Sequence, residues 1–273
     1  MAIEETHKWG IDFHAWINPY RISLTTKLSL DYILNIYKDY KSNPASDANC
    51  ILNGTSFIIL NPGLEKVKNF IVDTVIEFLE QYDVEAIHFD DYFYADMGAS
   101  GRLVGEFTIL DEQDQITYED YIKKNPGCPY HSNNSTEKAN WRREQVNLLI
   151  KRLYIAIGNY NKKYNKKVQF GISPTGVYKN GDGNVTYGMN FNAVTGSLTR
   201  GPQHYAAHLF ADTLQWINNG WIDYILPHPY QAFDSPIMGF GNLMPWWDKV
   251  VEYKSVNLFA GIGLFIANSE TNT

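Results

Sequence analysis

Short apolar runs alternate with segments of helical periodicity along the chain. The apolar runs have the length of buried strands and fall at residues 10–17, 84–90, 168–174, 221–230 and 256–265. Between them, apolar residues recur every three to four positions over helix-length segments at 64–83, 139–160, 204–220 and 244–255. Strands that alternate with helices predict βα units and a parallel sheet. The expected fold class is therefore α/β, as an incomplete (β/α)8 TIM barrel with five strands in view.

Three other segments carry local expectations. Residues 53–63, NGTSFIILNPG, predict a hairpin with an Asn-Gly turn. Residues 95–138 are rich in Gly, Asp and Asn and have no sustained period, which indicates a long irregular connection of a kind that is commonly functional. The first ten residues, MAIEETHKWG, read as an amphipathic helix that leads directly into the first strand.

The length and the strand count together predict one truncated domain. A chain of 273 residues is close to the roughly 250 of a single barrel, but such a barrel closes with eight strands. We therefore expect residues 1–273 to form one catalytic barrel domain that lacks two strands before residue 10 and one after residue 265. An open sheet exposes two hydrophobic edges, so we expect this segment alone to be unstable or to aggregate.

Composition and charge exclude several classes of protein. A net charge of -7, a pI near 5.5 and no dense Lys/Arg block argue against nucleic acid as a partner. Cys50 and Cys128 lack the spacing of a structural zinc site and are either free thiols or one disulfide. No apolar run is long enough for a transmembrane helix, and no signal peptide is visible. The 15% of aromatic residues suits stacking on sugar rings.

Polar and aromatic residues gather where the predicted strands end, which is where (β/α) barrels place their chemistry. The strand ends read HAWIN, HFDDY, SPT, PHPY and GIG. In the second of these, strand alternation puts His88 and Asp90 on the same side, so an inward His88 implies an inward Asp90. Asp91 is then expected at the rim of the barrel mouth. Either aspartate could instead cap the backbone of the following loop.

Seven motifs occur along the chain in the order typical of one family. They are HAWINPYR, NPGLEKVKNFIVD, EAIHFDDYFY, NWRREQVN, FGISPTGVYKN, FADTLQWINNGWIDYILP, and WW followed by NLFAGIGLF. In these motifs the chain resembles the glycosyl hydrolase-like 10 family of bacterial envelope proteins over nearly its whole length. The resemblance implies a (β/α)8 barrel, glycosidase activity on bacterial cell-wall glycan, and a location in the cell envelope or outside the cell, often as a lipoprotein.

The doubled aspartate carries the expected catalysis. A carboxyl group buried among aromatic side chains tends to stay protonated near neutral pH, as a general acid requires. Glycosidases ordinarily use a second carboxylate, which would lie in missing strands or among the acids of the long connection, namely Asp96, Glu106, Asp111, Glu119 and Asp120. Alternatively, Asp90 and Asp91 divide the roles of a substrate-assisted hexosaminidase, whose substrate attacks its own anomeric carbon with the 2-acetamido oxygen.

Further residues at the strand ends are expected to bind the substrate. This set comprises His14, Trp16, Asn18, Arg21, His88, Tyr92, Tyr94, Ser173, His228 and Tyr230. The tryptophan and tyrosines are candidates for stacking, and Arg21 for pairing with an aspartate or a substrate carboxylate. By contrast, Trp141, Arg142 and Arg143 are expected to anchor the long connection, and Trp246 and Trp247 to pack a helix against the barrel.

The sequence thus predicts a glycoside hydrolase that acts on a peptidoglycan-type or related N-acetylhexosamine glycan, with a polysaccharide or oligosaccharide as its partner. No cofactor and no metal are expected. One alternative is a carbohydrate-binding barrel without catalytic activity, which would keep the aromatic residues but lack a competent second carboxylate. A less favoured alternative is a metal-dependent hydrolase built from His14, His88, Asp90 and His228.

Overall fold

The main sheet of the molecule is parallel and follows chain order. In the computed structural model, the described residues are 2–23, 28–53, 58–94, 104–183, 196–206 and 209–263, with the backbone alone at 104–110. The sheet has the order β1 (His14–Ile17), β5 (Ala86–Phe89), β6 (Gln169–Ile172), β7 (Tyr224–Ile225) and β8 (Asn257–Leu258), and every neighbouring pair is parallel. Parallel strands that are added in chain order are the arrangement of a (β/α) barrel. The predicted α/β class and the five predicted strands are confirmed.

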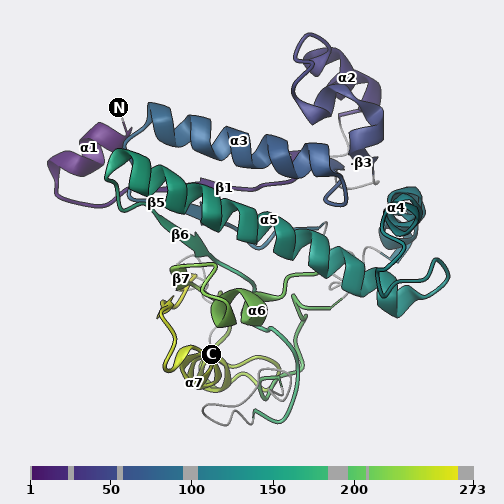
Figure 1. Cartoon of the computed structure of the whole chain (residues 1–273). Helices are drawn as coiled ribbons and strands as arrows, with labels where there is room; N and C mark the ends of the chain where they lie inside the picture. Colours follow the sequence, from purple (N-terminus) through teal and green to yellow (C-terminus); the bar gives the residue numbers. More distant parts are fainter. Residues whose placement is uncertain are drawn as a thin grey trace.

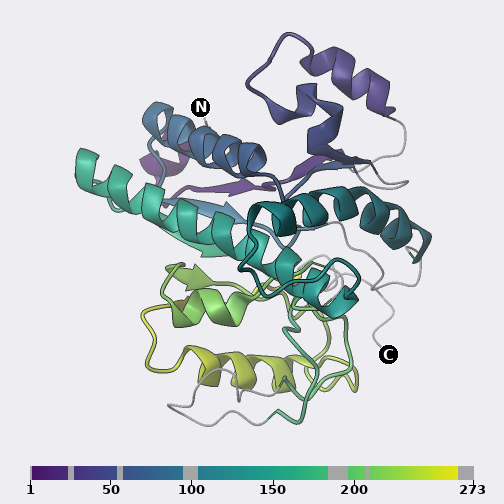
Figure 2. The same cartoon turned by 45° about the vertical axis from the view of Figure 1, so that its right-hand side comes forward.

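Helices cover one face of this sheet. Figures 1 and 2 show α3 (Glu65–Gln81) and α5 (Ser135–Tyr164) side by side along the strands, with α6 (Thr213–Asn218) and α7 (Phe240–Val251) beyond β7. The buried positions of α3 recur at helical spacing, at Val67, Ile71, Val75 and Leu79. The first predicted helix is α1 (Ala2–Lys8), which buries no residue. No helix in the described part of the chain is both long and apolar enough to span a bilayer.

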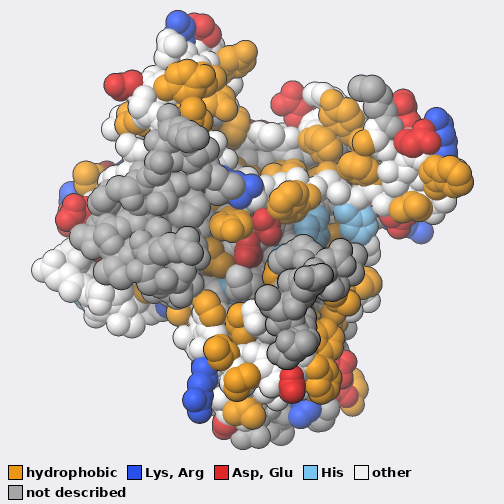
Figure 3. Space-filling model, turned by 180° about the vertical axis from the view of Figure 1, so that it is seen from behind, with side chains coloured by type: hydrophobic (Ala, Val, Ile, Leu, Met, Phe, Trp, Pro, Cys, Tyr) orange, Lys and Arg blue, Asp and Glu red, His pale blue; other side chains and the backbone are white. Residues whose placement is uncertain are grey.

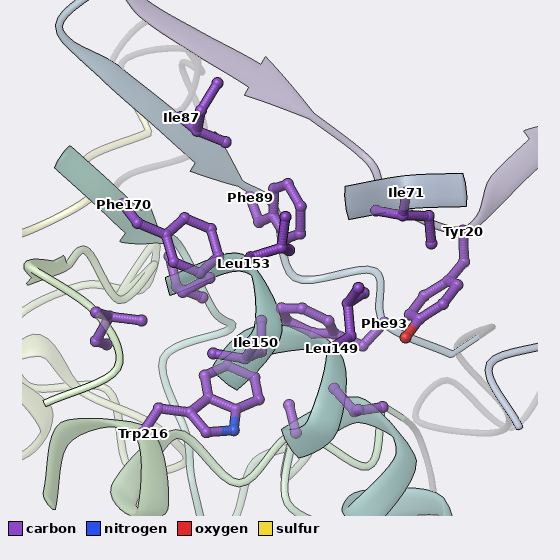
Figure 4. Close-up of a cluster of buried hydrophobic side chains, with 14 of the residues drawn as sticks. Tyr20, Ile71, Ile87, Phe89, Phe93, Leu149, Ile150, Leu153, Phe170 and Trp216 are labelled. Carbon is purple, nitrogen blue, oxygen red and sulfur yellow. The ribbon is translucent and has the colours of Figure 1, made fainter. Parts of the chain in front are cut away.

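The core lies between the sheet and these helices. Phe89 of β5 and Phe170 of β6 meet edge to face at 5.2 Å between ring centroids, and both point toward the α5 side chains in Figure 4. Ile87, Phe89 and Phe170 are fully buried, and burying each such side chain contributes roughly 1.5–3 kcal/mol. Because side chains alternate along a strand, the packing of Ile87 and Phe89 against the helices turns His88 to the opposite face.

A small antiparallel sheet branches off after β1. Its order is β2 (Arg21–Ser23), β4 (Ile58–Leu60) and β3 (Ile51–Asn53), and it is joined by α2 (Leu30–Tyr37) and by the short 3-10 helices η1 (Pro44–Ser46) and η2 (Ala48–Cys50). β3 and β4 pair antiparallel as the predicted hairpin requires. Residues 54–57, where the Asn-Gly turn was predicted, lie outside the described residues. Cys50 and Cys128 are both free thiols.

The prediction of an irregular connection at 95–138 is wrong over much of that range, because the range contains the helix α4 (Val104–Lys124). Polar and aromatic contacts with α5 hold this helix, so its sequence carries only a weak apolar period. Arg142 donates to Asp114 at 2.6 and 2.7 Å and to Asp111 at 2.6 Å, and Trp141 packs against Tyr118. The anchoring role predicted for Trp141 and Arg142 is confirmed, whereas Arg143 donates to the Tyr205 carbonyl instead.

Two helices near the carboxyl end differ from their predicted ranges. Residues 204–206 and 209–212 are not helical; α6 starts only at Thr213, where the Asp212 side chain caps it by accepting from the Gln215 N–H. α7 starts four residues earlier than predicted, at Phe240. Its Trp246 and Trp247 are buried in the core, as expected of residues that pack a helix against the sheet.

Candidate active site

The face of the sheet opposite α3 and α5 carries polar side chains in register. Trp16 of β1 lies beside His88 of β5, His88 beside Gly171 of β6, and Gly171 beside Tyr224 of β7. The residues that directly follow the ends of β1, β5 and β6 are Asn18, Asp90 and Ser173. Seen from behind, this side of the molecule shows histidine and acidic side chains close together near its centre, with hydrophobic side chains around them (Figure 3).

A pocket of about 450 Å³ opens at the carboxyl ends of the strands. Its lining consists of Trp16, His88, Asp90, Asp91, Tyr92, Ser173, His228 and Tyr230. All eight belong to the predicted site, although they come from loops and strands up to 214 residues apart in the chain. A parallel sheet brings them together because its strands all end at one edge.

The two aspartates lie together in this pocket. Asp90 is 8% exposed and its Oδ2 accepts a hydrogen bond from Asn18 Nδ2 at 3.2 Å, whereas Asp91 is half-buried. A carboxylate oxygen of each and a ring nitrogen of His228 all lie within 4.8 Å of one another. Asp91 thus faces the same pocket as Asp90. Strand alternation does not foresee this, because β5 ends at Phe89 and the backbone turns before Asp91.

The acids of the long connection lie elsewhere. Asp111 binds Arg142, Glu119 accepts from Gln115 at 2.9 Å, and Asp120 pairs with Lys123 at 3.7 Å along α4. Asp96 and the Glu106 side chain lie outside the described residues. Within the described chain, the acidic side chains that line the pocket are therefore Asp90 and Asp91.

Aromatic side chains form the walls of the pocket. Trp16 is 63% exposed, and Tyr230 stacks on His228 with ring centroids 4.9 Å apart and planes 13° apart. Burial, followed by the negative charges of Asp91 and Asp90, raises the pKa of Tyr230. Burial lowers the pKa of His228, and Asp90 opposes that shift. The imidazole therefore favours its neutral form, which can both donate and accept a hydrogen bond.

A chain of hydrogen bonds runs beneath the pocket. The Tyr224 hydroxyl lies 2.9 Å from His14 Nδ1 and 2.9 Å from His88 Nδ1, and His88 Nε2 lies 2.8 Å from Ser173 Oγ. Burial, together with the nearby His14, lowers the pKa of His88 to about 4, so His88 is neutral near pH 7. The prediction missed Tyr224. Its signal was present, because alternation along WIDYILPHPY puts Tyr224 on the same side as His228.

Three predicted residues take other places. Tyr94 is 1% exposed and packs edge to face against Phe210 at 5.1 Å, so the prediction that it stacks on a sugar is wrong. Arg21 lies over the Tyr92 ring, 5.3 Å from its centroid, and does not itself line the pocket. His14 contacts the Tyr224 hydroxyl and is not among the described residues that line the pocket.

The predicted metal alternative is not assembled from its four residues. His14 and His88 are both hydrogen-bonded to Tyr224, beneath the pocket. In the described part of the chain, the side chains close enough to share a metal ion are those of Asp90, Asp91 and His228. Two carboxylates and one imidazole form a donor set that suits a divalent cation.

Comparisons with a family model and with individual proteins place the chain in the same family. A family model described as Glycosyl hydrolase-like 10 matches residues 1–272. Glycosyl hydrolase YngK of Bacillus subtilis is 32% identical over 273 residues, which cover 98% of this chain and 46% of that protein. Glycosyl hydrolase DigH of Escherichia coli K12 is 32% identical over 269 residues, with 97% and 53% covered. The chain thus spans about half the length of these curated relatives.

Solved structures give a weaker likeness. An alpha-galactosidase from Lactobacillus brevis is 14% identical, with 94% of this chain and 28% of that chain covered and a TM-score of 0.35. The GH36 alpha-galactosidase AgaA from Geobacillus stearothermophilus is 11% identical, with 94% and 29% covered and a TM-score of 0.34. A likeness at this level carries no argument about the substrate or the fold.

Proposed function

Since the chain belongs to the glycosyl hydrolase-like 10 family, we propose that it is a glycoside hydrolase that cleaves an N-acetylhexosamine glycan of the bacterial cell-wall type. One observation carries the proposal: two aspartates share a strand-end pocket whose walls are aromatic. Aromatic faces bind the apolar faces of sugar rings, and carboxyl groups supply the acid and base of glycoside cleavage. We place the enzyme in the cell envelope or outside the cell, where such a glycan lies.

The closeness of the two carboxylates favours a substrate-assisted reaction. An inverting pair stands roughly 6.5–9.5 Å apart, with a water molecule between the second carboxylate and the sugar. Asp90 and Asp91 are neighbours in the chain and have oxygens within 4.8 Å of one another, closer than the roughly 5–5.5 Å of a retaining pair, so we infer that both approach a bound sugar from one side. The attack from the other side then has to come from the substrate, and the 2-acetamido oxygen of an N-acetylhexosamine is suitably placed for it.

The two aspartates divide the work according to their surroundings. Asp90 is the more buried and is held by Asn18, which suits the group that accepts the acetamido N–H and orients it. Asp91 is half-buried at the opening, which suits the group that meets the leaving group and water. In the first step the acetamido oxygen bonds to C1, the C1–O bond breaks, and Asp91 gives its proton to the leaving oxygen. In the second step water attacks C1, the bond between C1 and the acetamido oxygen breaks, and Asp91 takes the proton of that water.

The test is the release of products from purified, peptide-free peptidoglycan strands by the full gene product. Wild type is compared with Asp90→Asn and Asp91→Asn, which keep the size of each side chain. If wild type cuts the glycan and both variants lose several orders of magnitude, the doubled aspartate is the catalytic centre. Wild-type activity in either variant contradicts the proposal. A wild type that binds the glycan without cutting it indicates a carbohydrate-binding barrel instead.

A metal-dependent hydrolase is the second candidate, favoured by the grouping of Asp90, Asp91 and His228. A bound divalent ion would use these three side chains as ligands and activate water for attack on the substrate. Dialysis against a chelator separates the two candidates. Activity that is lost on chelation and restored by a divalent ion supports the metal enzyme, whereas unchanged activity supports the carboxylate mechanism.

A further inference from the structure

We infer that Tyr224 is a positioning residue of the pocket: it orders a hydrogen-bond chain that leaves the Ser173 hydroxyl as a donor toward the substrate. The inference rests on the proposed function, since it concerns the same pocket. Tyr224 does not line the pocket itself. It acts through His88, which contacts both the tyrosine and Ser173.

The fold makes room for Tyr224 to reach across the sheet. Tyr224 stands on β7, and its hydroxyl meets His88 two strands away on β5 and His14 three strands away on β1. The strand between β7 and β5 carries Gly171 in register with both Tyr224 and His88. A Cβ atom at Gly171 would lie 1.9 Å from the Tyr224 ring, so the ring occupies the space of the missing side chain. Tyr224 is only 2% exposed, and this geometry fixes the position of its hydroxyl.

The protons of a neutral imidazole allow two directions for the hydrogen bond between His88 and Ser173. A neutral imidazole has one N–H and one acceptor nitrogen, and a tyrosine hydroxyl has one proton to donate. With a single N–H, the His88 ring donates either to Tyr224 or to Ser173 but not to both. In one direction His14 donates to Tyr224, Tyr224 to His88, and His88 Nε2–H to Ser173. In the other direction, Ser173 donates to His88, His88 to Tyr224, and Tyr224 to His14.

The two directions give Ser173 opposite roles in the pocket. In the first, its oxygen receives the His88 proton, and its own proton remains available to an acceptor. In the second, its proton is used by His88, and Ser173 offers the substrate only lone pairs. The Ser173 hydroxyl also lies 3.4 Å from the Phe89 carbonyl, to which it donates. That contact fits the first direction, and it is long enough to be replaced by a hydroxyl or acetamido oxygen of a sugar.

The tautomer of His88 is the direct test, and it does not depend on activity. Selective ¹⁵N labelling of histidine, with the His88 signals assigned by their loss in His88→Gln, shows which ring nitrogen carries the proton. We expect the proton on Nε2 in the wild type and a mixture of tautomers in Tyr224→Phe. A wild-type proton on Nδ1 overturns the inference, whether or not the protein cuts a glycan.

A double-mutant cycle tests the coupling to the reaction. Tyr224→Phe and Ser173→Ala should each lower kcat/KM by about five- to tenfold, the effect of one hydrogen bond, and the double variant should lose little more than either. Tyr160→Phe is the matched control, since Tyr160 donates a buried hydrogen bond to the Leu79 carbonyl on the helical side of the sheet, and kcat/KM should not change. Additive losses, or a fully active Tyr224→Phe, contradict the inference. A wild type that cuts no glycan defeats the proposed function alone, because the tautomer measurement still decides the direction of the chain.

Discussion

The Asn18 amide donates a hydrogen bond of 3.2 Å to the Asp90 carboxylate, and so links the ends of β1 and β5 at the pocket. The two residues are 72 positions apart in the chain. They meet because parallel strands in register end at one edge of the sheet, and each lies just past the end of its own strand. The bond leaves Asp90 with a defined orientation, which a group that aligns a substrate needs.

Loss of this bond should impair catalysis more than folding. We expect Asn18→Ala to lower kcat/KM on the glycan about tenfold, the effect of one hydrogen bond to a charged group, and to leave the melting temperature nearly unchanged. Asn49→Ala is the control, because the Asn49 amide makes a comparable bond to Asp47 on the exposed surface. Equal activity in the two variants means that Asn18 does not orient Asp90.

The proposed division of roles between the aspartates predicts different responses to the leaving group. An aryl leaving group of low pKa needs no proton from the enzyme, so Asp91→Asn should cleave an activated aryl N-acetylhexosaminide nearly as fast as wild type. On the natural glycan the same variant should lose about 10²–10⁴-fold, the usual contribution of general acid catalysis. Asp90→Asn should be impaired on both substrates, since orientation of the acetamido group is needed in either case. If Asp90→Asn instead keeps its activity on the aryl substrate and Asp91→Asn loses activity on both substrates, the roles of the two aspartates are exchanged.

The ion pairs that hold α4 should make the protein sensitive to acid. Burial opposes ionisation of Asp111, but the hydrogen bonds and positive charges of Arg142 and Lys138 together outweigh it, and the pKa of Asp111 lies below its ordinary value. A carboxyl group whose pKa falls on folding stabilises the folded state above its unfolded pKa, and this contribution is lost as the pH drops. We expect the melting temperature of the wild type to fall below about pH 4, and Asp111→Asn to show a shallower fall from a lower starting value.

A surface aspartate provides the comparison for this measurement. Asp120 pairs with Lys123 along the same helix, with about half of its side chain exposed. Exposed pairs contribute little to stability, so the profile of Asp120→Asn should follow that of the wild type. If Asp111→Asn also follows the wild type at every pH, the contact with Arg142 does not stabilise the fold.

The sequence pattern predicts the structure correctly wherever a strand or helix is regular. His88 and Asp90 share a face because alternation holds through β5, and the five strands were found because each is a short apolar run. The pattern failed where the backbone leaves regular geometry. After Phe89 the chain turns, which brings Asp91 into the pocket and buries Tyr94 in the core.

Contacts between distant segments were the other source of failure. The helix α4 depends on charged partners in α5, and no periodicity within α4 reveals them. Tyr224 was overlooked for a similar reason. Its role depends on a glycine in a neighbouring strand, and a single sequence does not show which residue lies opposite which.

Substitution of Gly171 tests whether the Tyr224 ring is held in place for its hydrogen bonds with His88 and His14. Gly171→Ala would put a methyl group 1.9 Å from the Tyr224 ring, and the ring must move away from His88 and His14. Overpacking of this kind costs about 1–3 kcal/mol, so we expect a clear drop in the free energy of unfolding. Activity measured well below the melting temperature should fall at least as far as in Tyr224→Phe, because the same hydrogen bonds are lost.

Gly158→Ala is the matched control. A Cβ atom at this position of the helix α5 meets nothing within 4 Å, and the substitution should stabilise the protein by about 0.5–1 kcal/mol. A Gly171→Ala variant with the stability and activity of the wild type would show that the Tyr224 ring is not held over β6.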